Sequence, residues 1–262
     1  MALPYDDLVP EPSLIWNHAV TIHAPPSQIY PWLIQIGDSR AAFYSITFIE
    51  NAFCATSGEC RYVNANKIHP EWQNPEKGKQ GIIMDYMVIH DYQKDQYVLA
   101  VQSEKLPLKW TWLWYLNPLG NQTTKLIVRH RVSFPPDTPK SLIDSIFTTG
   151  FVMEKAMLNG IKSRAEGNIP WEGEEALGAL VWLLTFGIGI LCATRFIHPQ
   201  NDFRYLTIGI LVIGTLFVLT YIQPTMLWRV LLVLLITISF VICEKPGLLS
   251  KTLAGINKNN RS

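Results

Sequence analysis

The chain has 262 residues and a formal net charge of +1, which does not predict a broad electrostatic attraction to nucleic acid. Only 16% of its residues are charged, against roughly 25% in a typical soluble domain. The shortage is concentrated in residues 176–243, so the sequence divides into an ordinary globular part and an apolar part.

The first residues, 1–13, form an acidic arm that is broken by prolines and lacks the apolar stretch of a secretory signal peptide. Alternating residues then predict a strand over 16–24. Apolar residues at helical spacing predict a short helix within 25–37, which opens with two prolines and ends at a glycine, and a second short helix over 43–53. The polar residues 54–80 are expected to form a loop.

Four strand patterns follow in series and are joined by short links with turn residues. They cover residues 81–92, 96–104, 109–117 and 123–134. Because short links cannot cross a sheet, these strands are expected to form an antiparallel meander.

A long helix is predicted from Pro139 to Glu166, with Thr138 as its N-cap. Its apolar residues recur at three- and four-residue spacing, as on one face of a helix. They are Leu142, Ile146, Met153, Met157 and Ile161.

Three apolar stretches follow a hinge at 171–175 and precede a polar tail at 244–262. They cover residues 176–197, 205–222 and 226–243. Each is close to the roughly 20 residues that a helix needs to cross a bilayer core. A buried helical bundle in a soluble protein is the alternative, but such helices normally keep a polar face. We therefore expect three transmembrane helices.

The stretch KWTWLWYL carries the densest group of aromatic residues. Trp110, Trp112 and Trp114 alternate with Thr111 and Leu113, which is the spacing of one face of a strand. A helix lying on a membrane would place its rings at three- and four-residue spacing instead. These indoles either line a cavity or fill it, and the pattern leaves both interpretations open.

A sheet of this size must bury one face, and the long helix offers the apolar surface to cover it, which predicts an α+β domain over residues 14–170. The stretches HAVTIHAPPSQIYPWLIQIG, RAAFYSITFIEN, NANKIHPEWQNPEKG and FVMEKAMLNGIKSRAEG are similar to sequences of the SRPBCC or START-like superfamily. The middle two resemble a subgroup that is labelled polyketide cyclase/dehydrase or lipid-transport-like. The resemblance implies a helix-grip fold, in which a curved antiparallel sheet wraps around a long C-terminal helix.

The resemblance also implies a hydrophobic ligand tunnel between sheet and helix. Candidate ligand-binding residues are those expected to face this space. They are Trp110, Trp112, Trp114, Tyr44, Leu126, Val128, His130, Met153 and Met157.

His130 shares a strand face with Leu126 and Val128, so it is expected to point inward, where an imidazole could transfer protons. Tyr44, Glu50 and Asp85 are the other candidates for acid/base chemistry. Structural roles compete with each of these readings: a satisfied core histidine for His130 and an ion pair that fixes a loop for Glu50.

Neither a metal site nor a cofactor is expected. His69 and Glu71 share one loop, but a His-x-Glu pair alone is too short to indicate a metal site. The sequence contains no nucleophile elbow, P-loop or dinucleotide fingerprint. Cys54 and Cys60 flank a short loop and could form a disulfide, although free thiols are expected in a chain without an export signal.

Three classes of function fit these features. The first is a membrane-anchored binding module for a small hydrophobic or lipid-like ligand, which needs no catalysis. The second is an enzyme of the cyclase, dehydratase or hydrolase type, which requires at least two of the acid/base candidates to converge in one pocket. The third is a non-catalytic membrane scaffold or partner protein, and the sequence does not fix the oligomeric state.

The orientation in the membrane is predicted by two rules that conflict. More basic residues lie on the side of the tail, which favours a cytoplasmic tail and an exported domain. Export of so large an N-terminal segment normally needs a signal sequence. We therefore expect a multi-pass membrane protein with a cytoplasmic domain in which Cys54 and Cys60 are reduced.

Overall fold

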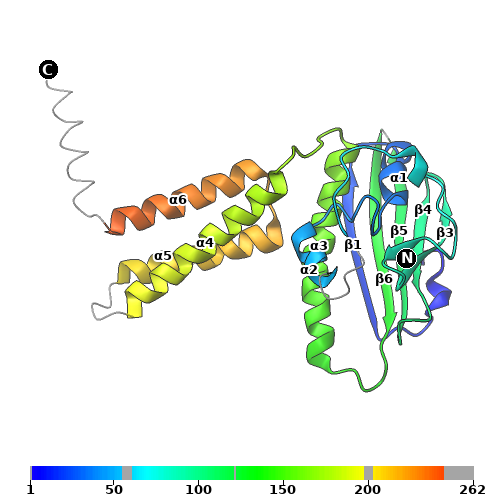
Figure 1. Ribbon diagram of the computed structural model, residues 1–262, viewed down its shortest axis with the longest axis horizontal. Helices are drawn as coiled ribbons and strands as arrows, with labels where there is room; N and C mark the ends of the chain where they lie inside the picture. Colours follow the sequence, from blue (N-terminus) through cyan, green and yellow to red (C-terminus); the bar gives the residue numbers. More distant parts are fainter. Residues whose placement is uncertain (1, 55–60, 121, 198–202, 245–262) are drawn as a thin grey trace. The chain divides into compact units, whose positions relative to one another are not determined.

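The structure is a computed structural model that describes residues 2–54, 61–120, 122–197 and 203–244. The chain divides into two compact units, Met1–Pro170 and Trp171–Ser262, which are considered one at a time. The N-terminal unit has the expected α+β fold, in which an antiparallel sheet packs against a long helix (Figure 1).

The sheet has six strands in the order β1-β6-β5-β4-β3-β2, and every neighbouring pair is antiparallel. The expected meander therefore forms, and the first strand of the chain closes it by pairing with the last. The strands are β1 (Leu14–Ile22), β2 (Gly81–Ile83), β3 (Met87–Gln93), β4 (Tyr97–Gln102), β5 (Lys109–Gly120) and β6 (Thr123–Ser133).

The single strand predicted over 81–92 is in fact two strands, β2 and β3, joined by a tight turn. Met84 lies in the turn with a φ of 47°, in the left-handed region. Gly81 makes the turn possible, because a Cβ at this position would lie 1.9 Å from the carbonyl oxygen of Met84. Within the mostly apolar run GIIMDYMVI, Asp85 alone is too weak a sign to predict this turn.

Helix α3 (Lys140–Ala165) packs on β1 and on α1 (Pro26–Ile34). It begins one residue later than predicted, because Pro139 and not Thr138 is the N-cap residue. Its buried residues Met157, Leu158 and Ile161 belong to the main core. Its first three turns are different, because Leu142, Ile146 and Phe147 are 50%, 41% and 39% exposed.

Helix α2 (Thr47–Cys54) and two short 3-10 turns, Asp6–Leu8 and Pro70–Trp72, complete the N-terminal unit. The N-terminal arm lies on the outer face of the sheet. Its Leu3 packs with Leu99 and Leu113. Asp6 pairs with Arg129 at 2.6 Å, which ties the arm to β6.

The C-terminal unit consists of three helices that are long and apolar enough to cross a membrane. They are α4 (Glu174–Ile197), α5 (Phe203–Phe217), which continues as a π-helical turn (Val218–Ile222), and α6 (Met226–Glu244). Only 11 to 22% of each span is buried within the structure. Apolar side chains thus cover the outside of this unit, as the composition predicts.

A polar cluster joins all three helices at one end of this bundle. The guanidinium of Arg195, near the end of α4, donates to both carboxylate oxygens of Glu244 on α6, at 2.9 and 3.2 Å. The hydroxyl of Tyr205 on α5 donates to the same carboxylate at 3.0 Å. We call these three residues the helix clamp.

Candidate functional site

A row of aromatic side chains crosses the inner face of the sheet. Trp16 on β1 lies opposite His130 on β6, and His130 lies opposite Trp112 on β5. The three rings stack along the row, with centroids 4.3 Å apart for Trp16 and His130 and 4.8 Å apart for His130 and Trp112. His130 therefore points inward, as the two-residue period predicted.

Glu154 projects from α3, which packs on the inner face of the sheet, and contacts this row of rings. Its oxygen Oε2 accepts a hydrogen bond from Nε1 of Trp16 at 2.9 Å. Nδ1 of His18 and Nε2 of His130 lie 2.9 and 3.2 Å from the same oxygen. One carboxylate oxygen thus gathers three nitrogen atoms from two strands, and we call Trp16, His18, His130 and Glu154 the carboxylate cluster.

The second oxygen of Glu154 has a different environment. Oε1 is buried and has no hydrogen-bond partner among the described residues, and the whole residue is only 5% exposed. A buried acceptor without a donor costs about 1–3 kcal/mol, and native structures rarely leave one unless a water or ligand supplies the donor. This oxygen is an open hydrogen-bonding position between the helix and the sheet.

A second indole fixes the proton on His130. Nε1 of Trp110 donates to Nδ1 of His130 at 3.0 Å. Because an indole nitrogen can only donate, Nδ1 must be the unprotonated acceptor and the ring proton must sit on Nε2. That proton is on the side of the ring that faces Glu154.

Charge in the cluster follows from burial and from these contacts. Burial lowers the pKa of His130, and this outweighs the opposing effect of Glu154. For Glu154, burial acts to raise the pKa, but His130 and His18 outweigh it and lower the pKa from 4.5 to about 2. At neutral pH an ionised carboxylate therefore faces a neutral His130.

One edge of the cluster approaches the surface. The ring of Trp16 meets Phe147 edge-on at 5.8 Å, and His18 meets Phe151 at 5.1 Å. The side chain of His18 is 19% exposed. Phe147 also belongs to the exposed first turns of α3, so apolar surface runs along α3 toward the carboxylate.

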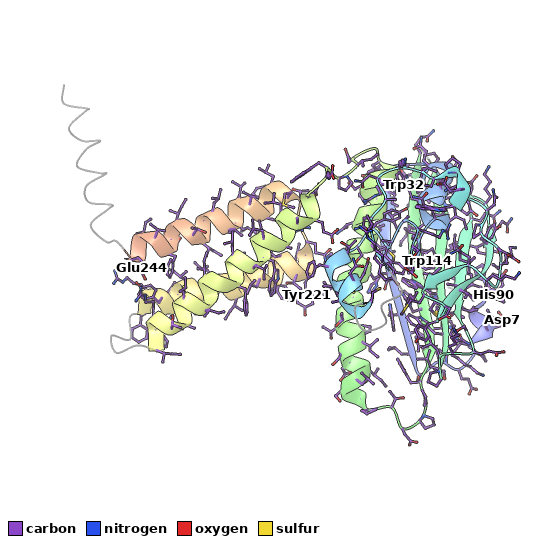
Figure 2. All side chains as sticks on the ribbon, in the orientation of Figure 1. Asp7, Trp32, His90, Trp114, Tyr221 and Glu244 are labelled. Carbon is purple, nitrogen blue, oxygen red and sulfur yellow. The ribbon has the colours of Figure 1, made fainter. Side chains whose placement is uncertain are left out.

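The predicted tryptophans pack into the interior. Trp112 stacks on Phe43 at 5.5 Å and lies 4.3 Å from Trp114, which is almost fully buried (Figure 2). Leu126, Val128 and Met157 are also part of this core, and Met153 is half-buried. The sequence left open whether these indoles line a cavity or fill it. The packing of Trp112 and Trp114 fits the second interpretation better, in which they fill the interior.

Tyr44 is buried away from the carboxylate cluster. Its hydroxyl donates to the carbonyl of Trp32 at 3.1 Å and accepts from the amide of Gln35 at 2.8 Å. Burial raises its pKa far above the usual range, so it is a poor acid at neutral pH. Gly160 lets α3 approach, because a Cβ there would lie 2.1 Å from the carbonyl oxygen of Tyr44.

The remaining acid/base candidates do not join His130 either. Glu50 is buried in α2. Asp85 is exposed and pairs with Lys105, so it does not point into the interior. The groups that the structure places beside His130 are Glu154 and His18, and an acid/base role for Tyr44, Glu50 or Asp85 stays a prediction.

Sequence reasoning missed Trp16, His18 and Glu154, although signals for them exist. Trp16 and His18 are two residues apart on a predicted strand and so share a face. Glu154 stands three and seven residues before Met157 and Ile161, which places it on the apolar side of the helix. A lone acidic residue on such a stripe is the sign of a buried carboxylate.

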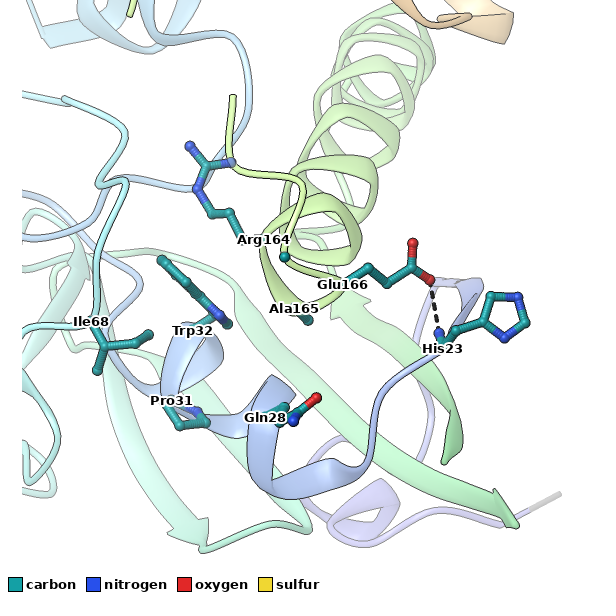
Figure 3. A pocket seen from close by; sticks show the side chains of 9 residues that line it. His23, Gln28, Pro31, Trp32, Ile68, Arg164, Ala165 and Glu166 are labelled. Atoms are coloured by element: carbon teal, nitrogen blue, oxygen red, sulfur yellow. Dashed lines mark hydrogen bonds between the residues drawn. The ribbon is translucent and has the colours of Figure 1, made fainter. Parts of the chain in front are cut away.

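A surface pocket of about 460 Å³ lies beside the end of α3 (Figure 3). Its charged residues are already engaged: Arg164 donates to Ala65, Gly160 and Asn66, and Glu166 accepts from the backbone N–H of His23. None of the predicted ligand-binding residues lines it. Its lining residues are His23, Gln28, Pro31, Trp32, Ile68, Arg164, Ala165, Glu166 and Gly167.

Among residues 2–54, 61–120, 122–197 and 203–244, no three His, Cys, Asp or Glu side chains are placed to hold a metal ion. His69 instead stacks on Trp72 with centroids 3.9 Å apart, and its Nδ1 lies 3.0 Å from Glu71. Cys54 forms a disulfide, so the expected free thiol at this position is wrong. Cys60 lies outside the described residues.

No family model matches the chain, and no curated protein matches it significantly. Three of the solved structures that are similar to this chain each cover 58% of it. A conserved protein of unknown function from Enterococcus faecalis shares 14% identity over 71% of its own length, with a TM-score of 0.31. A di-domain ARO/CYC protein of the BE-7585A biosynthetic pathway shares 13% over 46%, with a TM-score of 0.35. A START superfamily protein from Mycobacterium smegmatis shares 10% over 97%, with a TM-score of 0.27.

Proposed function

We propose that the chain is a membrane-anchored binding module for a small hydrophobic or lipid-like ligand, and that the ligand's polar group meets the carboxylate cluster. The observation that carries this proposal is Oε1 of Glu154, a buried ionised oxygen without a partner among the described residues. A protein interior does not favour such a group unless something supplies a donor. A bound ligand would satisfy it.

The apolar part of the ligand has a matching surface. Leu142, Ile146 and Phe147 are exposed on α3, and Phe147 contacts Trp16 of the cluster. Covering apolar area is worth about 25 cal/mol per Å², so an apolar chain would be held there by the hydrophobic effect. The ligand would thus lie along the exposed first turns of α3 where they meet β1, and not deep among the packed tryptophans.

The C-terminal unit supports the membrane anchor. Apolar side chains such as Leu183, Ile213 and Leu235 are 60%, 70% and 66% exposed, one on each helix. A soluble protein rarely exposes continuous apolar surface of this extent, whereas lipid tails solvate it well. An apolar ligand concentrates in the same bilayer, so an anchored domain would meet it at high local concentration.

Ligand capture by the full chain tests the proposal. The protein is purified from its native membrane into lipid nanodiscs, and bound apolar molecules are identified by native mass spectrometry. A molecule of defined mass should accompany the wild-type protein and be lost from Glu154→Gln, which removes the charge and keeps the shape.

Glu50→Gln is the matched control, because it changes a second buried glutamate that lies on another helix. It should keep the ligand. An empty wild-type protein, or equal ligand content in Glu154→Gln, would contradict the proposal.

Acid/base catalysis on a hydrophobic substrate is the second candidate. The specific observation in its favour is the proton that His130 holds on Nε2 beside the ionised Glu154. A pair of this kind can transfer a proton to a group that reaches it. If the captured molecule is chemically changed by the wild-type protein and unchanged by His130→Gln, the protein is an enzyme; if it is recovered intact from both, binding is its function.

We propose that the N-terminal unit lies on the oxidising side of the membrane, which revises the expected cytoplasmic position. Two observations support this: the disulfide at Cys54 and the larger number of basic residues on the side of the tail. Cells are treated with a membrane-permeant thiol blocker, and the protein is then reduced and labelled. Label at Cys54 supports the oxidising side, whereas a Cys54 already blocked before reduction restores the cytoplasmic one.

A further inference from the structure

We propose that the polar group of the ligand is a hydrogen-bond donor, either a hydroxyl or a protonated amine, and not a carboxylate, phosphate or ester. This inference rests on the proposed function and specifies the ligand class for the same site. It follows from which oxygen of Glu154 is left without a donor, and from the charge of that carboxylate.

The first argument concerns donors. Trp16 donates to Oε2 of Glu154. The proton of His130 is fixed on Nε2 by Trp110, and Nε2 lies 3.2 Å from Oε2, although the geometry there is not that of a formed hydrogen bond. Oε2 is therefore already surrounded by donors, and the position left open on Glu154 is an acceptor, the buried Oε1. An acceptor can be satisfied only by a ligand that donates.

The second argument concerns charge. The described contacts of Glu154 are one tryptophan and two histidines, and they include no lysine or arginine. Burial keeps His130 neutral by lowering its pKa. An acidic head group would therefore bring a second negative charge beside an ionised carboxylate in a medium that screens poorly. An ester or ketone would bring no such charge, but it has no proton to donate, so it would leave Oε1 without a partner.

The aromatic surroundings suit either kind of donor. Indole faces attract a cation, and an ammonium beside Trp16 would gain from this as well as from the carboxylate. A hydroxyl has the additional capacity to accept, and Nε1 of Trp112 is a buried donor without a partner among the described residues. Donation to Glu154 is common to both groups and is what the proposal requires.

Four probes of one chain length test it: dodecanol, dodecylamine, dodecanoate and methyl dodecanoate. The full chain is placed in lipid nanodiscs at mildly alkaline pH, where the acid is ionised and the amine is still charged. Affinity is read from the shift of the thermal unfolding midpoint with probe concentration. Wild type, Glu154→Gln and Glu50→Gln are compared, so partition of each probe into the bilayer cancels.

Dodecanol or dodecylamine should stabilise the wild type, and Glu154→Gln should weaken that binding on the order of 10- to 100-fold, the range for a hydrogen bond to a charged group. Glu50→Gln should bind as the wild type does. The acid and the methyl ester should bind weakly to all three proteins.

The outcomes separate this inference from the proposed function. If the acid or the methyl ester binds the wild type as tightly as the alcohol and the amine, the donor requirement is wrong although a binding module remains. Equal binding of the donors to wild type and Glu154→Gln overturns the role of Oε1. If none of the four probes binds, the proposed function fails, and this inference fails with it.

Discussion

Two carboxylates on opposite faces of one sheet have contrasting environments. On the outer face, Asp91 of β3 accepts from the hydroxyl of Tyr97 at 2.8 Å and also from Tyr5 and Lys77, so both of its oxygens are occupied. On the inner face, three nitrogens crowd around one oxygen of Glu154 while the other has no partner among the described residues.

This difference distinguishes a carboxylate with a structural role, Asp91, from a candidate binding group, Glu154. Burial acts to raise the pKa of Asp91, but Lys77, Tyr5 and Tyr97 outweigh it and hold the pKa well below its usual range. Asp91 and its partners fasten the N-terminal arm to the sheet and leave no position for a ligand. Glu154 is also ionised, but its Oε1 has no partner among the described residues, which is why we propose it and not Asp91 as a binding position.

The largest effect is expected from Glu154→Leu. The substitution leaves the buried N–H of Trp16 without an acceptor, at about 1–3 kcal/mol, and removes the carboxylate that lies beside His18 and His130, so we expect a loss of about 3 kcal/mol of folding free energy. Denaturant unfolding of the full chain, followed by tryptophan fluorescence, measures it. An equal or larger loss for Asp91→Leu would remove the distinction between the two carboxylates.

His130→Gln should change the pH dependence of stability. The folded pKa of His130 is lowered below 6.5, so the unfolded chain binds more protons below that pH, and the folded state loses stability as pH falls from about 6.5. The slope is at most about 1.4 kcal/mol per pH unit for one group. Glutamine can accept from Trp110 and donate to Glu154 but does not titrate.

Thermal unfolding midpoints of wild type and His130→Gln between neutral and mildly acidic pH give the comparison. The His130→Gln variant should not show the loss of stability that begins near pH 6.5 in the wild type. Glu154 acts in a separate window, since its lowered folded pKa contributes stability above 4.5 that is lost only as pH falls toward about 2. Parallel curves for the two proteins near pH 6 would mean that His130 is not neutral in the folded state.

Trp110→Phe also tests the charge state of His130, with a smaller expected change in folding free energy. It removes the donor to Nδ1 of His130 and should cost about 1 kcal/mol beyond any change in packing. Without that donor, Nδ1 is free to take a proton, so the pKa of His130 should rise toward 6.5, and the loss of stability below that pH should be smaller and end at higher pH. Imidazole signals in NMR titrations report this pKa directly, and an unchanged value would contradict the assigned tautomer.

Asp91→Asn should have the smallest effect, about 1 kcal/mol or less, because the side chain is partly exposed and water can replace its partners. Its expected consequence is local: faster hydrogen exchange in the N-terminal arm, with ligand content unchanged. Loss of the ligand from Asp91→Asn would show that the outer face contributes to binding and would break the comparison.

Most elements of the fold follow from residue patterns. The alternation on β6 places His130 inward, the later part of the stripe on α3, at Met157 and Ile161, identifies its buried face, and the composition of α4, α5 and α6 identifies the candidate spans. The turn between β2 and β3 was missed, because it depends on a backbone contact between Gly81 and Met84 and not on polarity.

The candidate site was predictable only in part. His130 could be identified because it lies in one recognisable strand face. Its partners come from β1 and α3, which are 112 and 24 residues away in the chain for His18 and Glu154, so only the paired register brings them together. The spacing of apolar residues predicts the face of a strand or helix on which a residue lies. It does not predict which residue of another strand or helix that side chain contacts.

The helix clamp has a consequence for how the chain is made. Arg195 leaves the ribosome with the first apolar helix, whereas its acceptor Glu244 arrives only at the end of the third, 49 residues later. If the helices enter a membrane as proposed, this guanidinium has no partner until then and would stay at the membrane surface, where a long cationic side chain can remain hydrated. The helix clamp can form only when the third helix is present, so the final helix would complete the assembly of the bundle.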